Sequence, residues 1–178
     1  MMNYGAIKGR DIANGPGVRV SLFVSGCTHH CPGCFNPDTW DFAYGAPFTP
    51  ETVQEILDLM SPDYITGFTL LGGEPMEVQN QKALLPLLQK IKERYPTKSI
   101  WTYSGYTLEE LLGNTRARCA VTDEMLALID VLVDGEFLLA QKDIRLRFRG
   151  SANQRLIDLR KTLATGNIVL WDDGNTRR

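Results

Sequence analysis

The chain has 178 residues, close to the usual size of one compact domain, so a single domain over residues 1–178 is predicted. Hydrophobic residues make up 43% of the chain and charged residues 22%, a composition that excludes an intrinsically disordered protein. The formal net charge of -2 provides no broad basic field, so neither nucleic acid nor an anionic membrane is an expected partner. The N-terminus lacks a secretion signal and no stretch approaches about 18 uninterrupted apolar residues, so a soluble, cytoplasmic protein is expected.

The first half of the chain alternates apolar strands with amphipathic helices. Residues 18–24 are rich in β-branched and apolar side chains, which predicts a buried strand. Residues 49–60 repeat apolar side chains at helical spacing behind a capping threonine, which predicts a helix. A second strand is predicted over residues 64–71. The leucines of residues 84–91 then share one helical face, with Pro86 in the first turn of that helix or at a kink.

The second half continues the alternation. The predicted elements are a strand over 98–103, a helix over 108–112 behind a Thr107/Glu110 capping box, a helix from Thr122, strands over 131–133 and 145–149, a helix over 153–163 and a strand over 168–171. Alternating strands and helices predict a parallel sheet, because parallel strands need crossover connections. A full eightfold barrel typically needs about 250 residues. An incomplete, open barrel or a doubly wound sheet would fit this length. We expect an α/β fold that is an open partial (β/α)6 TIM-like barrel with parallel strands, and a tail after about residue 172 that is a candidate for disorder.

The chemically unusual segments each follow a predicted strand. They are the cysteine loop and residues 72–75, 103–106, 134–135 and 149–151. In parallel α/β folds the carboxyl ends of the strands converge on the active site. The sequence therefore predicts that these loops share one pocket.

Three of the four cysteines are clustered. Cys27, Cys31 and Cys34 fall within eight positions, whereas Cys119 stands far away. Such a pattern in a reducing compartment indicates metal or redox chemistry rather than a disulfide framework.

The spacing alone leaves three chemistries open. A structural zinc site needs four ligands, so it would have to recruit His29, His30 or Cys119. A thioredoxin-like redox pair of Cys31 and Cys34 would leave the first cysteine without a role. A four-iron cluster would use all three thiolates and leave one iron free to bind a substrate.

Several segments together resemble a known family. Cys-x3-Cys-x2-Cys after the first predicted strand and Gly72-Gly73-Glu74-Pro75 after the second resemble the two signature motifs of the radical S-adenosylmethionine (SAM) enzymes. Asn14-Gly-Pro-Gly-Val-Arg19 before the cysteine loop is similar to the glycyl-radical-enzyme activases. Cys31-Pro-Gly-Cys34-Phe-Asn-Pro, Trp40, Tyr103-Ser-Gly-Tyr106, Val131-Leu-Val-Asp-Gly135 and Arg149-Gly-Ser-x-Asn-Gln154 resemble, among these, the activating proteins of anaerobic ribonucleoside-triphosphate reductases.

The resemblance implies a 4Fe-4S cluster held by Cys27, Cys31 and Cys34, with SAM chelating the open iron. Reductive cleavage of SAM would give a 5′-deoxyadenosyl radical, which would abstract a hydrogen atom from a backbone glycine of the anaerobic reductase's catalytic subunit. A low-potential donor such as reduced flavodoxin would supply the electron. The alternatives are activation of another glycyl radical enzyme, such as pyruvate formate-lyase, and, from other classes, a zinc-stabilised binding module or a thiol–disulfide oxidoreductase.

The resemblance also implies a set of residues around SAM and the cluster. These residues are Gly33, Cys34, Phe35, Gly72, Gly73, Glu74, Pro75, Ser104, Asp134 and Arg149. The glycine pair would let the backbone approach the methionine end of SAM, near the charge of Glu74. Phe35 would shield the cluster or stack on adenine. Ser104 and Asp134 would bind the ribose, and Arg149 would meet the SAM carboxylate.

Other conspicuous residues receive no role. His29 and His30 lie between cluster cysteines and are expected to point outward, and Cys119 is expected to be an isolated thiol. Residues 142–161 hold seven Lys or Arg against two Asp, a balance more typical of a solvated surface than of a docking site.

Overall fold

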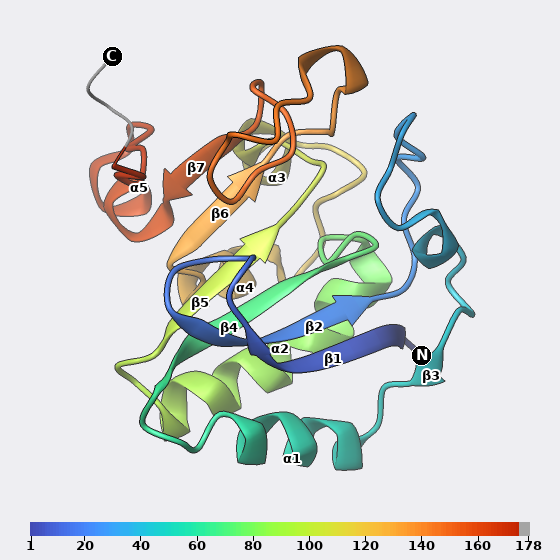
Figure 1. Ribbon diagram of the computed structural model, residues 1–178, viewed down its shortest axis with the longest axis vertical. Coiled ribbons are helices and arrows are strands. Elements are labelled where there is room, and N and C mark those ends of the chain that lie inside the picture. Colours follow the sequence, from blue (N-terminus) through green and yellow to red (C-terminus); the bar gives the residue numbers. More distant parts are fainter. Residues whose placement is uncertain (175–178) are drawn as a thin grey trace.

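A computed structural model describes residues 1–174 and shows one mixed sheet of seven strands (Figure 1). The strands are β1 (Asn3–Asp11), β2 (Val18–Val24), β3 (Ala46–Pro47), β4 (Ile65–Gly72), β5 (Ser99–Tyr103), β6 (Val131–Asp134) and β7 (Arg155–Asp158), in the order β3-β1-β2-β4-β5-β6-β7. The four central strands β2, β4, β5 and β6 run parallel. The outer strands β1, β3 and β7 pair antiparallel with their neighbours. The sheet is open, and a TIM-like barrel is not confirmed.

All the helices except the last lie between consecutive parallel strands of the chain, and the last follows β7. They are α1 (Pro50–Leu59), α2 (Val78–Arg94), α3 (Leu108–Leu112), α4 (Thr122–Leu128) and α5 (Leu159–Thr165), with 3-10 turns η1 (Pro37–Trp40) and η2 (Leu139–Gln141). Figure 1 shows α1 and α2 together beneath the strands. Within residues 1–174, no helix combines the length and the apolar character needed to cross a membrane.

The helix starts follow the capping signals of the sequence. The Thr49 side chain accepts a hydrogen bond from the backbone N of Thr52, and the Thr52 side chain accepts one from the backbone N of Thr49. Thr107 forms the same kind of capping box with Glu110. Each box satisfies backbone donors that the first helical turn leaves unpaired. Pro86 lies in the interior of α2 rather than in its first turn.

The two faces of the sheet differ in character. Side chains such as Leu22, Phe68 and Ile100 point to the helices and are completely buried in the main apolar core. The opposite face carries Arg19 and Trp101, both buried, and a smaller apolar cluster. Because successive side chains of a strand point to opposite faces of the sheet, a run of buried strand residues contributes to both of these clusters.

The sequence analysis missed the first strand, and several of its predictions for residues 145–171 are wrong. The β1 strand was not expected, because its two glycines and its charges weaken the strand signal. Residues 145–149 form a turn instead of a strand, anchored by hydrogen bonds from the backbone and side chain of Arg145 to Asp143. Within the predicted helix over 153–163, the first part is strand β7, and residues 168–171 contribute only an isolated bridge. Six parallel β/α units are therefore not present in residues 1–174. The tail after about residue 172 was a candidate for disorder, and residues 175–178 of this tail lie outside the described residues.

Candidate active site

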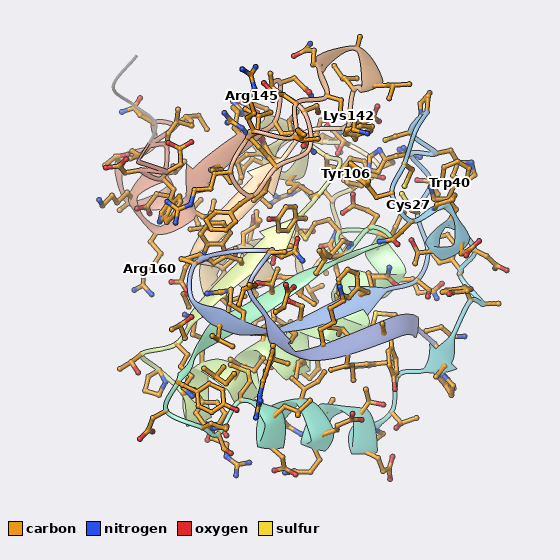
Figure 2. The ribbon with its side chains drawn as sticks, viewed as in Figure 1. Cys27, Trp40, Tyr106, Lys142, Arg145 and Arg160 are labelled. Carbon is orange, nitrogen blue, oxygen red and sulfur yellow. The ribbon has the colours of Figure 1, made fainter. Side chains whose placement is uncertain are left out.

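A cavity of about 500 Å³ opens at the carboxyl ends of the parallel strands. It is lined by Lys8, Ala13, Asn14, Phe23, Cys27, His29, Cys31, Cys34, Phe35, Asn36, Trp40, Leu71, Gly72, Gly73, Glu74, Tyr103, Ser104, Gly105, Phe137, Leu146, Phe148, Arg149, Gly150 and Gln154. The predicted convergence of the cysteine loop with segments after three other predicted strands is confirmed. The size of the cavity suits a small organic ligand. Figure 2 shows Cys27 and Trp40 close to each other, with Lys142 on the loop drawn above them.

The three clustered thiols all line this cavity. Cys27 is buried, Cys31 and Cys34 are half-buried, and all three are free of disulfides. Burial raises the pKa of the Cys27 thiol to about 12, and burial together with Glu136 raises the pKa of Cys31. A thiolate in such a place needs a neighbouring positive charge, which the irons of a cluster provide.

Backbone donors also surround the sulfurs. The backbone N of Asn36 lies 3.4 Å from Cys34 Sγ, and backbone groups of His29 and His30 contact Cys27. Hydrogen bonds to cysteine sulfur are one means by which proteins tune iron–sulfur clusters. Within residues 1–174, no three His, Cys, Asp or Glu side chains converge closely enough to share one metal ion. A four-iron cluster does not require that convergence, because its thiolates bind different irons.

The glycine pair holds the loop after β4 against the start of the cysteine loop. Gly72 has φ of 106°, and a Cβ on Gly73 would lie 2.7 Å from the carbonyl oxygen of Gly26. The backbone N of Gly73 donates to Val24 O at 2.7 Å, and that of Glu74 donates to Gly26 O at 2.8 Å. Both positions therefore need glycine because of the protein's own packing. The contact of this backbone with a methionine group stays a prediction.

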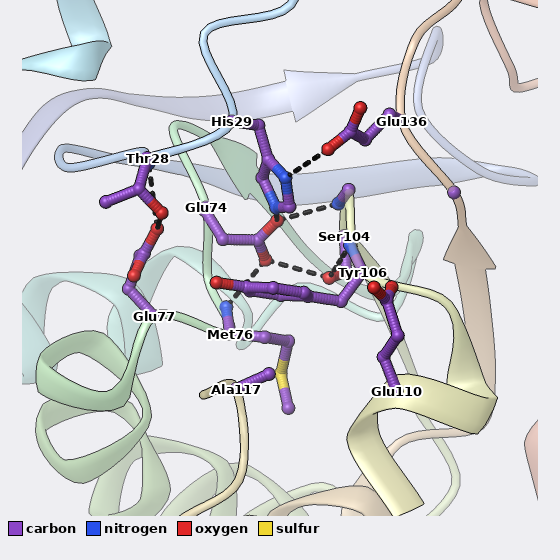
Figure 3. Close-up of polar contacts among 12 residues, drawn as sticks. Thr28, His29, Glu74, Met76, Glu77, Ser104, Tyr106, Glu110, Ala117 and Glu136 are labelled. Carbon is purple, nitrogen blue, oxygen red and sulfur yellow. Dashed lines mark hydrogen bonds and ion pairs between the residues drawn. The ribbon is translucent and has the colours of Figure 1, made fainter. Parts of the chain in front are cut away.

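Glu74 is the centre of a buried hydrogen-bond network, with 1% of its surface exposed (Figure 3). Its Oε1 accepts from Met76 N at 2.8 Å and from Ser104 Oγ at 2.9 Å. Its Oε2 accepts from Gly105 N at 2.7 Å and lies 2.9 Å from His29 Nε2. These four partners fill the accepting capacity of a carboxylate. Glu74 can therefore act on a cationic ligand through its charge, while its oxygens are occupied by the protein.

His29 was expected to point outward, and the structure shows that it points inward. Its side chain is 4% exposed and lies between two carboxylates, with Nδ1 2.8 Å from Glu136 Oε1. Burial alone would lower the pKa of His29, but the hydrogen bonds and charges of Glu74 and Glu136 raise it to about 9. Cysteine spacing carries no signal for this contact, because both carboxylates come from other loops.

Two other predicted residues, Phe35 and Arg149, line the cavity, whereas Gly33 does not. Phe35 is exposed and packs on Phe137 with ring centroids 5.1 Å apart, and its contact with the cluster or adenine stays a prediction. Gly33 has φ of 77° and lies beside Leu139, outside the cavity lining. Arg149 lines the cavity and donates from Nη1 to the backbone of Gln154 at 2.9 Å.

Two nitrogen donors of the cavity lining are buried and have no hydrogen-bond partner within the described chain. They are Arg149 Nε and Trp40 Nε1. Buried donors are almost always paired in proteins, so an unpaired one indicates a missing acceptor. An anionic or carbonyl group of a bound ligand fits this need.

Three further residues that the sequence analysis singled out also lie outside the cavity lining. Asp134 is buried and binds the backbone N of Leu108 at 2.8 Å and the guanidinium of Arg155, so its ribose contact stays a prediction. Pro75 is buried. The Cys119 sulfur lies 3.5 Å from Gln81 Oε1 between α2 and α4, which agrees with an isolated thiol.

A match to a family model places the chain in a class of iron–sulfur proteins. Residues 13–157 match the family described as "4Fe-4S single cluster domain". The chain is 44% identical over 161 residues to the anaerobic ribonucleoside-triphosphate reductase-activating protein of Escherichia coli (strain K12), covering 89% of this chain and 100% of that protein. It is 43% identical over 155 residues to the protein of that name from Pasteurella multocida (86% and 95%) and 41% over 157 residues to that of Enterobacteria phage T4 (87% and 93%).

A match of this extent shows the family. The chain belongs to the anaerobic ribonucleoside-triphosphate reductase-activating proteins, which the motifs after the predicted strands had indicated.

Proposed function

We propose that this protein is a radical SAM enzyme that generates the glycyl radical of an anaerobic ribonucleoside-triphosphate reductase. The observation that carries the proposal is one cavity lined by both Cys27, Cys31 and Cys34 and the glycine pair after β4. When bound there, a 4Fe-4S cluster and SAM would supply a one-electron cleavage to methionine and a 5′-deoxyadenosyl radical. That radical would take a hydrogen atom from a glycine of the reductase's catalytic subunit.

The residues of the chain bind and orient these groups. The three cysteines supply thiolate ligands from one loop, which leaves one iron for the amino acid end of SAM. Arg149 offers the SAM carboxylate a guanidinium N–H that is unpaired within residues 1–174, and Trp40 offers an indole N–H. Phe35 and Phe137 form an aromatic wall against which adenine can pack.

The open mouth of the cavity suits a macromolecular substrate. Exposed apolar side chains, Phe35, Leu139 and Ile144, lie on the cysteine loop and the 135–154 connection. A glycine-bearing loop of the reductase could enter from this side, and reduced flavodoxin or another low-potential donor could supply the electron. The site would operate in the cytoplasm, where thiols stay reduced.

The test uses the anaerobically reconstituted, reduced protein with SAM and the candidate reductase. The proposal expects about four irons and four sulfides per chain, release of 5′-deoxyadenosine and a glycyl-radical doublet in the electron paramagnetic resonance spectrum. Deoxyadenosine without the doublet would reject the proposed partner. A colourless protein with stoichiometric zinc would reject the chemistry and favour a zinc-stabilised binding module.

A further inference from the structure

The first residue after Cys27 is held by the loop that follows β4. Thr28 donates to Glu77 Oε1 from its backbone N at 2.8 Å and from its hydroxyl at 2.6 Å. The next residue, His29, meets Glu74 of the same loop at 2.9 Å. One short segment therefore holds the spacer between the first two cysteines with two carboxylates, as Figure 3 shows.

His29 extends this contact to two further strand ends. Its Nδ1 meets Glu136 on the connection after β6, and its Nε2 meets Glu74 after β4. Glu74 in turn binds Ser104 and Gly105 after β5. A continuous chain of hydrogen bonds therefore joins the loops that follow all four parallel strands.

The groups around the His29 imidazole pack closely against it. The Tyr106 ring lies edge-on at 4.4 Å between ring centroids, and a Cβ on Gly105 would lie 2.6 Å from His29 Cδ2. The neighbouring His30 is exposed, and its ring stacks on Trp40 at 4.5 Å instead. Two adjacent histidines in one loop thus have opposite environments.

We propose that His29 is a positioning residue for the cluster: through Glu74 and Glu136 it fixes where the cysteine loop presents its thiols relative to the glycine pair. This inference rests on the proposed function, because it concerns how that cluster is held. A loop with three ligands has many conformations, and fixing it before binding reduces the entropy lost on binding. Contacts behind metal ligands commonly change metal affinity about 10–100-fold when removed.

The test compares His29→Leu, His29→Gln and His30→Leu in the full-length, anaerobically reconstituted protein. We expect His29→Leu to release iron to a chelator about tenfold faster than the wild type and to bind SAM about tenfold more weakly. The midpoint potential and the paramagnetic resonance spectrum of its reduced cluster should also change. His29→Gln, whose amide can still donate to Glu74, should recover part of each loss. His30→Leu is the matched control and should stay within about twofold of the wild type.

Glu136→Gln provides a second variant that does not threaten folding, because the Glu136 side chain is 50% exposed. It keeps an acceptor but loses the charge facing His29, and we expect about threefold faster iron release. Equal iron release from His29→Leu and His30→Leu would overturn the inference, as would Glu136→Gln and His29→Gln both matching the wild type. A wild-type protein that binds no SAM would reject the proposed function, while the iron-release comparison would still decide the role of His29.

Discussion

Buried charged side chains lie at both ends of the parallel strands, and the two ends differ in how completely their polar groups are hydrogen-bonded within the protein. At the end away from the cavity, Arg19 is completely buried. Its guanidinium donates to Thr69 at 2.8 Å, to Ser99 and Phe68 O at 3.0 Å, and to Pro16 O at 3.3 Å. Burial lowers its pKa to about 10, yet its donors are satisfied within the protein.

At the cavity end the polar groups are only partly satisfied. Glu74 has four partners, but Arg149 Nε and Trp40 Nε1 are buried without one in the part of the chain that the structure describes. A completed network stabilises the fold, whereas an incomplete one beside a cavity is available to a ligand. Substitutions at the two ends should therefore separate stability from binding.

The largest effect is expected at the proposed cluster ligands. Cys27→Ser should reduce the iron content of the reconstituted protein from about four per chain to near zero, because hard oxygen ligands replace soft sulfur poorly. Iron and sulfide analysis measures this. Cys119→Ser is the control and should retain the full complement, since its thiol lies near Gln81 between helices. An equal loss of iron in both variants would contradict the assignment.

Arg19→Met should have the next largest effect. It leaves several buried oxygen acceptors without a donor, which we expect to cost roughly 3–5 kcal/mol of folding free energy. At about 2–4 °C per kcal/mol, the melting temperature of the reconstituted protein should fall by about 10 °C. Arg160→Met, at an arginine that is 69% exposed and pairs with Asp130 at 3.2 Å, is the control and should shift it by about 2 °C at most. A stable Arg19→Met variant would show that this end of the parallel strands is not a structural network.

The sequence predicted the parts of the fold that local signals determine. The four parallel strands are runs of buried apolar residues, and α1 and α3 begin at capping threonines, so each element carries its own signal. The antiparallel edges could not be predicted in this way. Residues 145–149 alternate like a strand, but a hydrogen-bonded turn at Asp143 takes them away from the sheet. Pairing at an edge depends on a partner strand, which local alternation cannot identify.

The candidate site shows the same division. The cysteines and the glycine pair could be identified because their chemistry is written in short motifs. The sequence could not identify His29, Glu77 and Glu136, because their roles depend on contacts between loops. His29 lies 45 positions from Glu74 and 107 from Glu136, and Thr28 lies 49 positions from Glu77. Ordinary spacing in the sequence gives such residues no distinguishing mark.

Gly73→Ala tests the junction between the glycine loop and the cysteine loop, with an intermediate effect. The new Cβ would lie 2.7 Å from Gly26 O and 2.8 Å from Thr39 O, and both are backbone atoms that cannot move freely. We expect a loss of about 2 kcal/mol, or about 4–8 °C in melting temperature, and slower cluster reconstitution. Gly9→Ala is the control, because its Cβ would meet only the side chain of Leu59 at 3.2 Å. Equal shifts for both variants would contradict a special requirement at Gly73.

Arg149→Met is expected to have the smallest effect on stability and completes the comparison with Arg19→Met. The variant removes a buried N–H that has no partner in the described residues, along with one hydrogen bond to Gln154, so the melting temperature should change by about 2 °C at most. SAM binding, measured by equilibrium dialysis on the reconstituted protein, should weaken about tenfold, which corresponds to about 1.4 kcal/mol. A large drop in melting temperature with unchanged SAM affinity would assign Arg149 to the fold, as with Arg19. The predicted pattern instead separates the two arginines, since one completes its hydrogen bonds within the protein and the other with the ligand.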